Sequence, residues 1–162
     1  MTPEHEGAIR GSWAEVATRA EEVAARFHAR LLALDPEVSA MFATADPAAH
    51  RQRLAATLAA LAESLDEPER LVAVLVPLAR RHAGYHLRQE QFGLAEDALM
   101  DALHEVLGER FSAEVEEAWR ELVELVSAVM RRAVGPAEGR SDSRTAGQSD
   151  RTEKTEEAEG AR

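Results

Sequence analysis

Cysteine is absent from this chain of 162 residues, which carries 19 basic and 30 acidic side chains and a formal net charge of -11. Without cysteine there is no disulfide, no thiolate metal site and no cofactor attached through a CxxCH motif. An acidic chain that lacks a clustered basic stretch is also a poor match for phosphate groups or an anionic membrane surface. We therefore expect neither a nucleic acid nor a membrane as partner.

Long apolar runs are missing too. The longest, residues 71–79, is far too short to cross a bilayer, and residues 1–10 contain no apolar signal-peptide core. Together with the lack of cysteine, this predicts a cytoplasmic protein. Aromatic residues make up only 4% of the chain, and its alanine, leucine and valine residues recur at helical spacing. This pattern predicts an all-α fold with no strand.

The chain is long enough for one domain with a substantial core. We place that domain at residues 1–134. Residues 135–162 contain no apolar side chain larger than alanine and are rich in serine, threonine, glutamate, glycine and arginine. Such a segment cannot bury a core, so we predict a disordered acidic tail that follows the domain.

Proline and glycine predict where the helices begin and end. A capping residue followed by proline occurs three times, at Thr2, Asp35 and Asp46, and each pair predicts a helix start. The first long apolar stripe is predicted to lie on two helices that meet within residues 19–22. Pro77 predicts a break in the helix that contains it, with a short second helix restarting there. Further boundaries are expected at Gly84, Gly108 and Ser112.

Two histidines lie on apolar helical stripes and are therefore predicted to point inward. One stripe is Leu71, Leu75, Leu78 and His82; the other is His50, Leu54, Leu58, Leu61 and Leu65. The short connection at residues 64–68 makes the two helices antiparallel neighbours. About 14 residues, or roughly 21 Å of helix, separate each histidine from this connection. The two imidazoles are thus expected to face each other across the open end.

An inward histidine is more often a satisfied core residue than a ligand, and this alternative stays open. Two buried imidazoles without partners would cost about 1–3 kcal/mol each, so something is expected between them. A zinc site needs four ligands, and a di-iron site needs inward Glu-x-x-His motifs; neither set is present. A flat apolar cofactor with four equatorial ligands needs only axial imidazoles and apolar walls, which favours haem.

The chain resembles a globin over residues 9–130. The resemblance is carried by IRGSW at residues 9–13, HARLLALDPEVSAMF at 28–42, His50 with Leu54, VPLARRHAGYHL at 76–87, and Trp119. The match is closest to the neuroglobin and cytoglobin types and to the globin domain of bacterial flavohaemoglobins. The resemblance implies a globin fold of about seven to eight helices around a pocket for non-covalently bound haem b.

Carried over by residue, the resemblance implies that His82 is the proximal iron ligand and that His50 is the distal residue. Phe42 is expected to stack on the porphyrin and Leu54 to lie beside the gas ligand. We expect the second nitrogen of His82 to bond a carbonyl one turn back, that of Leu78. It also stays open that His50 binds the iron directly when no gas is present.

Other residues of the matched segments are expected at the cofactor too. Leu87 and Phe92 are predicted to contact haem, whereas His86 either lies near a haem propionate or is a solvated loop residue. Two departures stand out. His28 replaces the tyrosine, phenylalanine or leucine usual above the iron, so two distal imidazoles could compete for the ligand. Phe92 replaces a tyrosine that flavohaemoglobins use together with a glutamate on the proximal side, and no glutamate is evident at the matching end of the last helix. The peroxidase-like proximal network that this pair forms is therefore expected to be missing.

These features predict an oxygen-binding globin that also binds NO and CO and serves in oxygen storage, transport or sensing. The rival is a nitric oxide dioxygenase, in which O2 and NO give nitrate and a separate reductase supplies electrons. A globin-like signalling module without haem is a third alternative, so enzymatic activity stays open. We expect a monomer or homodimer. Of the remaining residues, we expect His5 and His104 on the surface and Trp13 and Trp119 in the core.

Overall fold

The computed structural model describes residues 1–43 and 45–134, so the predicted tail at 135–162 lies outside the described residues. The described residues form helices and no strand, as predicted. The helices are α1 (Pro3–Thr18), α2 (Ala20–Leu34), α3 (Pro36–Phe42), α4 (Pro47–Glu63), α5 (Pro68–Ala83), α6 (Gln89–Leu107) and α7 (Ala113–Val134), with a 3-10 turn at Gly108–Arg110. No described helix combines the length and hydrophobicity needed to traverse a bilayer.

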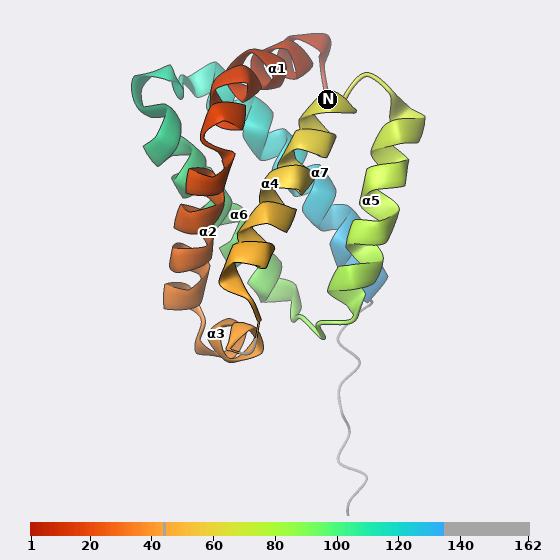
Figure 1. The fold of residues 1–162 in the computed structure, drawn as a ribbon. Coiled ribbons are helices and arrows are strands. Elements are labelled where there is room, and N and C mark those ends of the chain that lie inside the picture. Colours follow the sequence, from red (N-terminus) through yellow and green to blue (C-terminus); the bar gives the residue numbers. More distant parts are fainter. Residues whose placement is uncertain (44, 135–162) are drawn as a thin grey trace, which may run out of the picture.

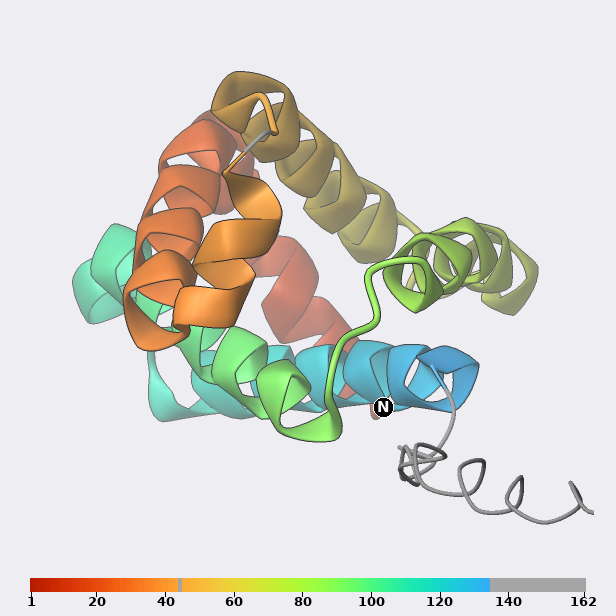
Figure 2. The ribbon, with the colours of Figure 1, turned by 90° about the horizontal axis from the view of Figure 1, so that it is seen from below.

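The helices cross one another and pack around a shared hydrophobic core. In Figure 1, α1 crosses the top. α2 and α5 run downwards along the chain, α4 runs upwards between them, and α7 lies behind. α2 packs against α4 and α6, and α7 packs against α1, α5 and α6. The view from below shows α4 and α7 on opposite sides, with α5 next to the ends of both (Figure 2). α4 and α5 run antiparallel, as the short connection between them predicts.

The three predicted helix starts are confirmed. Thr2 accepts a hydrogen bond from the backbone N–H of His5, and Asp35 accepts from those of Glu37 and Val38. Asp46 accepts from the backbone N–H of Ala48 at 2.9 Å. Each cap satisfies donors that the first helical turn leaves free, and the proline that follows needs no partner. These caps set where α3 and α4 begin.

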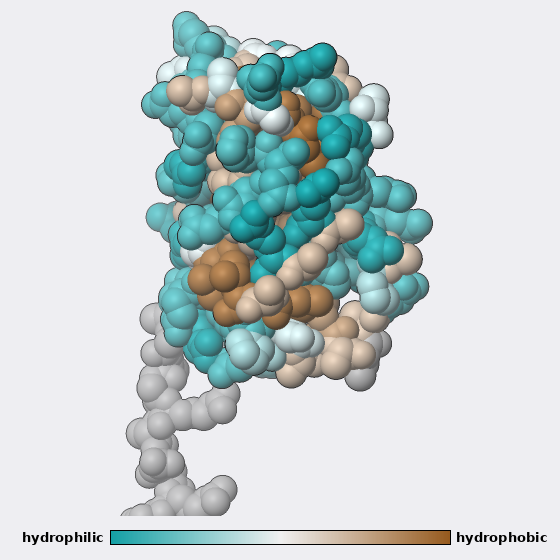
Figure 3. Space-filling view, turned by 90° about the vertical axis from the view of Figure 1, so that its left-hand side faces the viewer, coloured by the Kyte–Doolittle hydropathy of each residue, from teal (hydrophilic) through white to brown (hydrophobic). Residues whose placement is uncertain are grey.

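Trp119 is the largest fully buried side chain, as its predicted place in the core requires. Its Nε1 donates to Ser12 Oγ at 2.9 Å, which joins α7 to α1. Trp13 is half-buried, with its ring centroid 6.4 Å from that of Trp119. Outside this core the surface is mainly hydrophilic, with hydrophobic patches in both the upper and the lower half of the face drawn in Figure 3.

His5 is partly exposed, in keeping with its predicted place on the surface, and it forms an ion pair there. His5 Nδ1 lies 2.5 Å from Glu121 Oε2, and the amino group of Met1 lies 2.9 Å from Glu121 Oε1. The hydrogen bond to Glu121 raises the pKa of His5 and lowers that of the carboxyl group. The start of α1 is thereby tied to α7, a contact between residues too distant in sequence for spacing to reveal. His104 is exposed, as predicted.

The predicted break at Pro77 was wrong, because α5 continues through it from Pro68 to Ala83. Proline leaves the carbonyl four residues earlier, that of Ala73, without its helical partner. Ala73 and Pro77 are both exposed, so water can reach this carbonyl. The opposite face buries Leu75 and Leu78 in the core. We infer that this packing holds the helix together across the proline.

Gly84 ends α5, as predicted, but with right-handed backbone angles (φ -72°) rather than a left-handed cap. The positive φ in this turn is found two residues later, at His86 (φ 54°). Gly108, which ends α6, does have a positive φ of 55°. Ser112 accepts a hydrogen bond from the N–H of Val115 at the start of α7, as expected.

Replacing Pro77 by alanine should stabilise the fold, because alanine restores the missing N–H donor within α5. The gain is limited by the greater freedom of the unfolded chain, which leaves a rise of about 1–3 kcal/mol in the free energy of unfolding. Urea unfolding followed by circular dichroism measures it. Pro68→Ala is the matched control, since proline is favourable at the first position of α5 and its loss should give no gain. An unchanged or lower midpoint for Pro77→Ala would contradict the explanation.

Candidate functional site

A largely apolar cavity opens among α2 to α7. Its empty space, including the open mouth, amounts to about 1250 Å³. Leucine, valine, phenylalanine and methionine side chains make up most of its walls, and two histidines, His50 and His82, also line it. A cavity with many apolar walls and a few polar groups is typical of a site for a largely apolar small molecule.

His82 lies in the last turn of α5, and its Nδ1 is 2.8 Å from the carbonyl oxygen of Leu78. A carbonyl oxygen can only accept, so Nδ1 carries the proton and Nε2 keeps a free lone pair. This hydrogen bond one turn back is the one that we predicted for His82. Burial, the largest effect, lowers the pKa of the imidazole, which keeps it neutral at neutral pH. His82 is therefore oriented and able to act as a nitrogen ligand.

His50 reaches the same cavity from the first turns of α4, where Asp46 and Pro47 set the helix start. Its pKa falls to about 4, first because of burial and then because of the charges that His28, Arg53, His82 and Arg81 carry when protonated. His50 is thus neutral at neutral pH and can present either an N–H donor or a bare nitrogen.

Phe42 and His28 complete a group of three aromatic rings with His50. The Phe42 ring centroid is 4.5 Å from that of His50, and the His28 centroid is 5.0 Å from both. Phe42 lines the cavity, whereas His28 does not. His28 is buried, and burial is the main cause of its lowered pKa.

This chemistry fits haem. Apolar walls suit the porphyrin, and the free Nε2 of His82 suits its iron. A family model described as globin matches residues 25–130.

The chain belongs to the globin family.

Two curated relatives of this globin are flavohaemoproteins. The one from Halalkalibacterium halodurans is 32% identical over 116 residues, which cover 70% of this chain and 28% of the relative. The one from Bordetella pertussis is 28% identical over 121 residues, which cover 74% and 30%. This globin therefore spans less than a third of their length. Family membership and these relatives imply haem as its cofactor.

A solved structure shares the fold. It is an engineered carbene transferase made from a putative nitric oxide dioxygenase of Rhodothermus marinus, with a TM-score of 0.75. The similarity covers 83% of this globin and 93% of that chain, at 23% identity. At this identity the likeness supports the globin fold, and it carries no conclusion about activity.

The other predicted residues are only partly brought together. Leu54, Leu87 and Phe92 line the cavity of this globin, as does Leu78. His86 is exposed and does not line it. This arrangement is compatible with the solvated alternative for His86.

The proximal side of the globin carries an ion pair that was not predicted from the sequence. Arg131 lies 5.8 Å from the centre of the Phe92 ring and 2.5 Å from a carboxylate oxygen of Glu96. The described hydrogen bond of His82 goes to the Leu78 carbonyl, with no carboxylate involved. The expected lack of a peroxidase-like proximal network stays a prediction.

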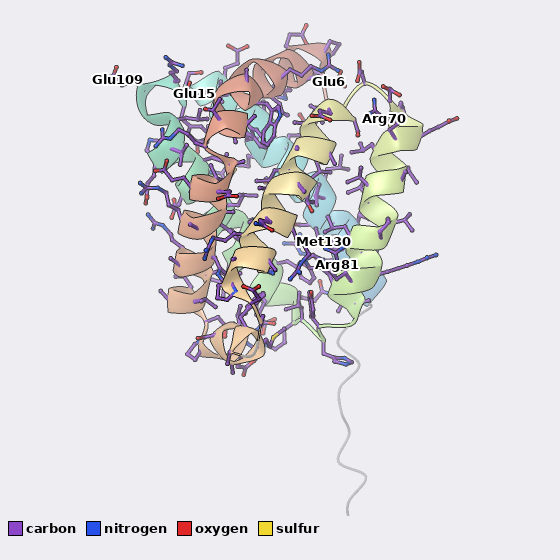
Figure 4. The ribbon with its side chains drawn as sticks, in the orientation of Figure 1. Glu6, Glu15, Arg70, Arg81, Glu109 and Met130 are labelled. Carbon is purple, nitrogen blue, oxygen red and sulfur yellow. The ribbon has the colours of Figure 1, made fainter. Side chains whose placement is uncertain are left out.

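Arg53 and Arg81 were also missed. Both line the cavity, and neither makes an ion pair with another described residue. Figure 4 shows Arg81 between α4 and α5, at the level of the lower half of both helices. Arg53 follows His50 by one turn and Arg81 directly precedes His82, so their positions beside the inward stripes could have identified them. Unpaired cations at the edge of an apolar cavity can bind the carboxylates of a ligand.

Replacing His50 should reduce the sensitivity of the haem-free chain to acid. Because the pKa of His50 is lowered from 6.5 to about 4, protons bind more strongly to the unfolded state. The stability of the wild type should be full above pH 6.5 and fall as the pH drops towards 4. His50→Gln should lose less of its free energy of unfolding between about pH 7 and about pH 5 in urea titrations. Parallel losses in His50→Gln and the wild type would contradict the lowered pKa; His104→Gln is the surface control.

Proposed function

We propose that this globin binds O2, and also NO and CO, reversibly at haem iron held by His82, and that it serves in oxygen storage or sensing. The observation that carries the proposal is the pairing of His82 with Leu78. Their hydrogen bond of 2.8 Å leaves Nε2 free beside an apolar cavity that His50 enters from another helix. When bound, haem supplies a ferrous iron with an open coordination position for a diatomic gas.

His82 and the arginines would hold the cofactor. The Leu78 carbonyl fixes the ring of His82 and raises the basicity of Nε2, which strengthens a metal bond. Arg53 and Arg81 lie where their guanidinium groups can pair with the two carboxylates of haem. The apolar side chains of Phe42 and Leu54 exclude water from the distal side.

His50 would control the gas ligand. As a neutral imidazole, it can donate an N–H to the partly negative O2 and slow its departure. A hydrogen bond of this kind is worth about 1.5–3 kcal/mol, which corresponds to about a ten- to hundredfold change in affinity. If a nitrogen of His50 instead takes the open iron position, the apparent gas affinity falls by the fraction of chains with an open pocket.

A nitric oxide dioxygenase is the second candidate, and the kinship with flavohaemoproteins favours it. This reaction joins NO and O2 to nitrate and consumes one electron, so it needs an electron donor. The described residues contain no domain for flavin or nicotinamide, and we propose a separate reductase as the partner and the cytoplasm as the location. Sustained NO consumption with NADH and a reductase would favour this candidate over storage or sensing.

Replacing His50 by leucine should speed O2 release. Loss of the N–H donor should raise the O2 dissociation rate constant about ten- to a hundredfold, with a smaller effect on association. Stopped-flow displacement of O2 by CO measures this rate. His86→Leu is the matched control, because His86 is exposed and lies outside the cavity lining. An unchanged rate in His50→Leu would remove the proposed role of His50.

A further inference from the structure

Helix α5 presents a strip of apolar side chains to the solvent. Val72 is 56% exposed, which makes it the most exposed large hydrophobic residue in the described part of the chain, and Val76, one turn later, is 41% exposed. Ala73 and Pro77 are exposed beside them. These four residues are called the α5 strip below. Apolar residues scattered singly over a surface need no explanation, but four together on one face of a helix indicate a contact surface.

A charged side chain lies at each end of the α5 strip. Glu69 precedes Ala73 by one turn, and Arg80 follows Val76 by one turn, so both lie on the same face of the helix as the strip. Both are exposed, and neither makes an ion pair with another described residue. Along roughly 16 Å of helix, this face therefore runs from an acid through apolar residues to a base.

The strip is accessible to another molecule. In Figures 1 and 2, α5 forms an outer edge of the fold, with α4 and α7 on its inner side. Its inner face buries Leu75 and Leu78 in the core. Figure 4 shows side chains of α5 that point away from the rest of the molecule at this edge. A helix of a second molecule can therefore reach the α5 strip without displacing α4 or α7.

The order of residues along this face is complementary to itself. In a two-fold dimer the same patch of each copy meets the other, so residue i contacts residue j and j contacts i. Two α5 helices packed antiparallel, with the two-fold axis between positions 74 and 75, place Glu69 of each copy opposite Arg80 of the other. Between these two ion pairs, each member of the strip meets another member: Val72 meets Pro77, and Ala73 meets Val76.

We propose that the α5 strip is the contact between two copies of this globin in a two-fold homodimer, closed by two reciprocal ion pairs between Glu69 and Arg80. A second copy is the partner that fits, because the face carries the complement of its own charges. A strip on one helix is small beside the roughly 800 Å² that each partner buries in a standard interface, so the dimer should depend on concentration. No residue of the strip lines the cavity, so association needs no haem.

Sedimentation equilibrium of the full chain tests the proposal. The wild type should show a monomer–dimer equilibrium within a range from about 1 μM to about 1 mM. Glu69→Arg should weaken the dimer about tenfold or more, because two-fold symmetry turns one substitution into two repulsive pairs. Arg80→Glu should do the same. The double variant, Glu69→Arg with Arg80→Glu, should regain wild-type association because it restores both pairs with the charges exchanged.

A mixture of the two single variants gives the sharpest readout. Glu69→Arg and Arg80→Glu should each associate weakly alone, and together they should form a heterodimer, because every facing pair then joins opposite charges. A general loss of folding cannot produce this rescue. Leu34→Arg is the control, since Leu34 is a leucine of α2 that is 51% exposed and lies outside the strip. It should leave the equilibrium unchanged.

A wild-type chain that stays monomeric up to about 1 mM would overturn the proposal without any variant. A dimer that persists unchanged in both single variants would place the contact elsewhere and would also overturn it, as would a mixture of the two that fails to associate. None of these measurements uses haem or a gas ligand. Failure of the proposed gas binding would therefore leave them valid.

Discussion

The hydrogen bond between His82 Nδ1 and the Leu78 carbonyl is the interaction on which the site depends. It joins two residues of one helical turn, so it forms wherever α5 is intact. It assigns the proton of His82, leaves Nε2 free and fixes the plane of the ring. The continuity of α5 through Pro77 thus matters for chemistry as well as for stability, because a break there would separate Leu78 from the buried face that holds it in place.

The distal side depends on a different kind of constraint. Asp35 and Asp46 fix the starts of α3 and α4, which carry Phe42 and His50 to the cavity. Asp35 is itself buried and accepts a hydrogen bond from Gln91 of α6 at 2.9 Å. The short helix that holds Phe42 is therefore tied to the helix that follows the turn after His82. One buried network connects the two sides of the cavity.

Local patterns made much of this predictable. Helical spacing placed His50 and His82 inward, and cap-plus-proline pairs located α3 and α4. The predicted helix break at Pro77 was wrong because the helix-breaking effect of proline concerns the backbone alone. The packing of Leu75 and Leu78 on the opposite face of α5 decides the outcome. The His5–Glu121 pair joins residues far apart in the chain, and no spacing rule reveals such contacts. Likewise, the ring contact between His28 and His50 follows only from the packing of α2 on α4.

The central claim is that His82 holds haem iron in this cavity. Titration of the haem-free chain with haem, followed by absorption spectra of the ferric and dithionite-reduced forms, tests it most directly. The wild type should saturate at one haem per chain with a histidine-ligated spectrum. His82→Gly should lose that spectrum and regain it when free imidazole is added, because imidazole can replace the missing ring. A His82→Gly variant that binds haem with the wild-type spectrum in the absence of imidazole would contradict the account.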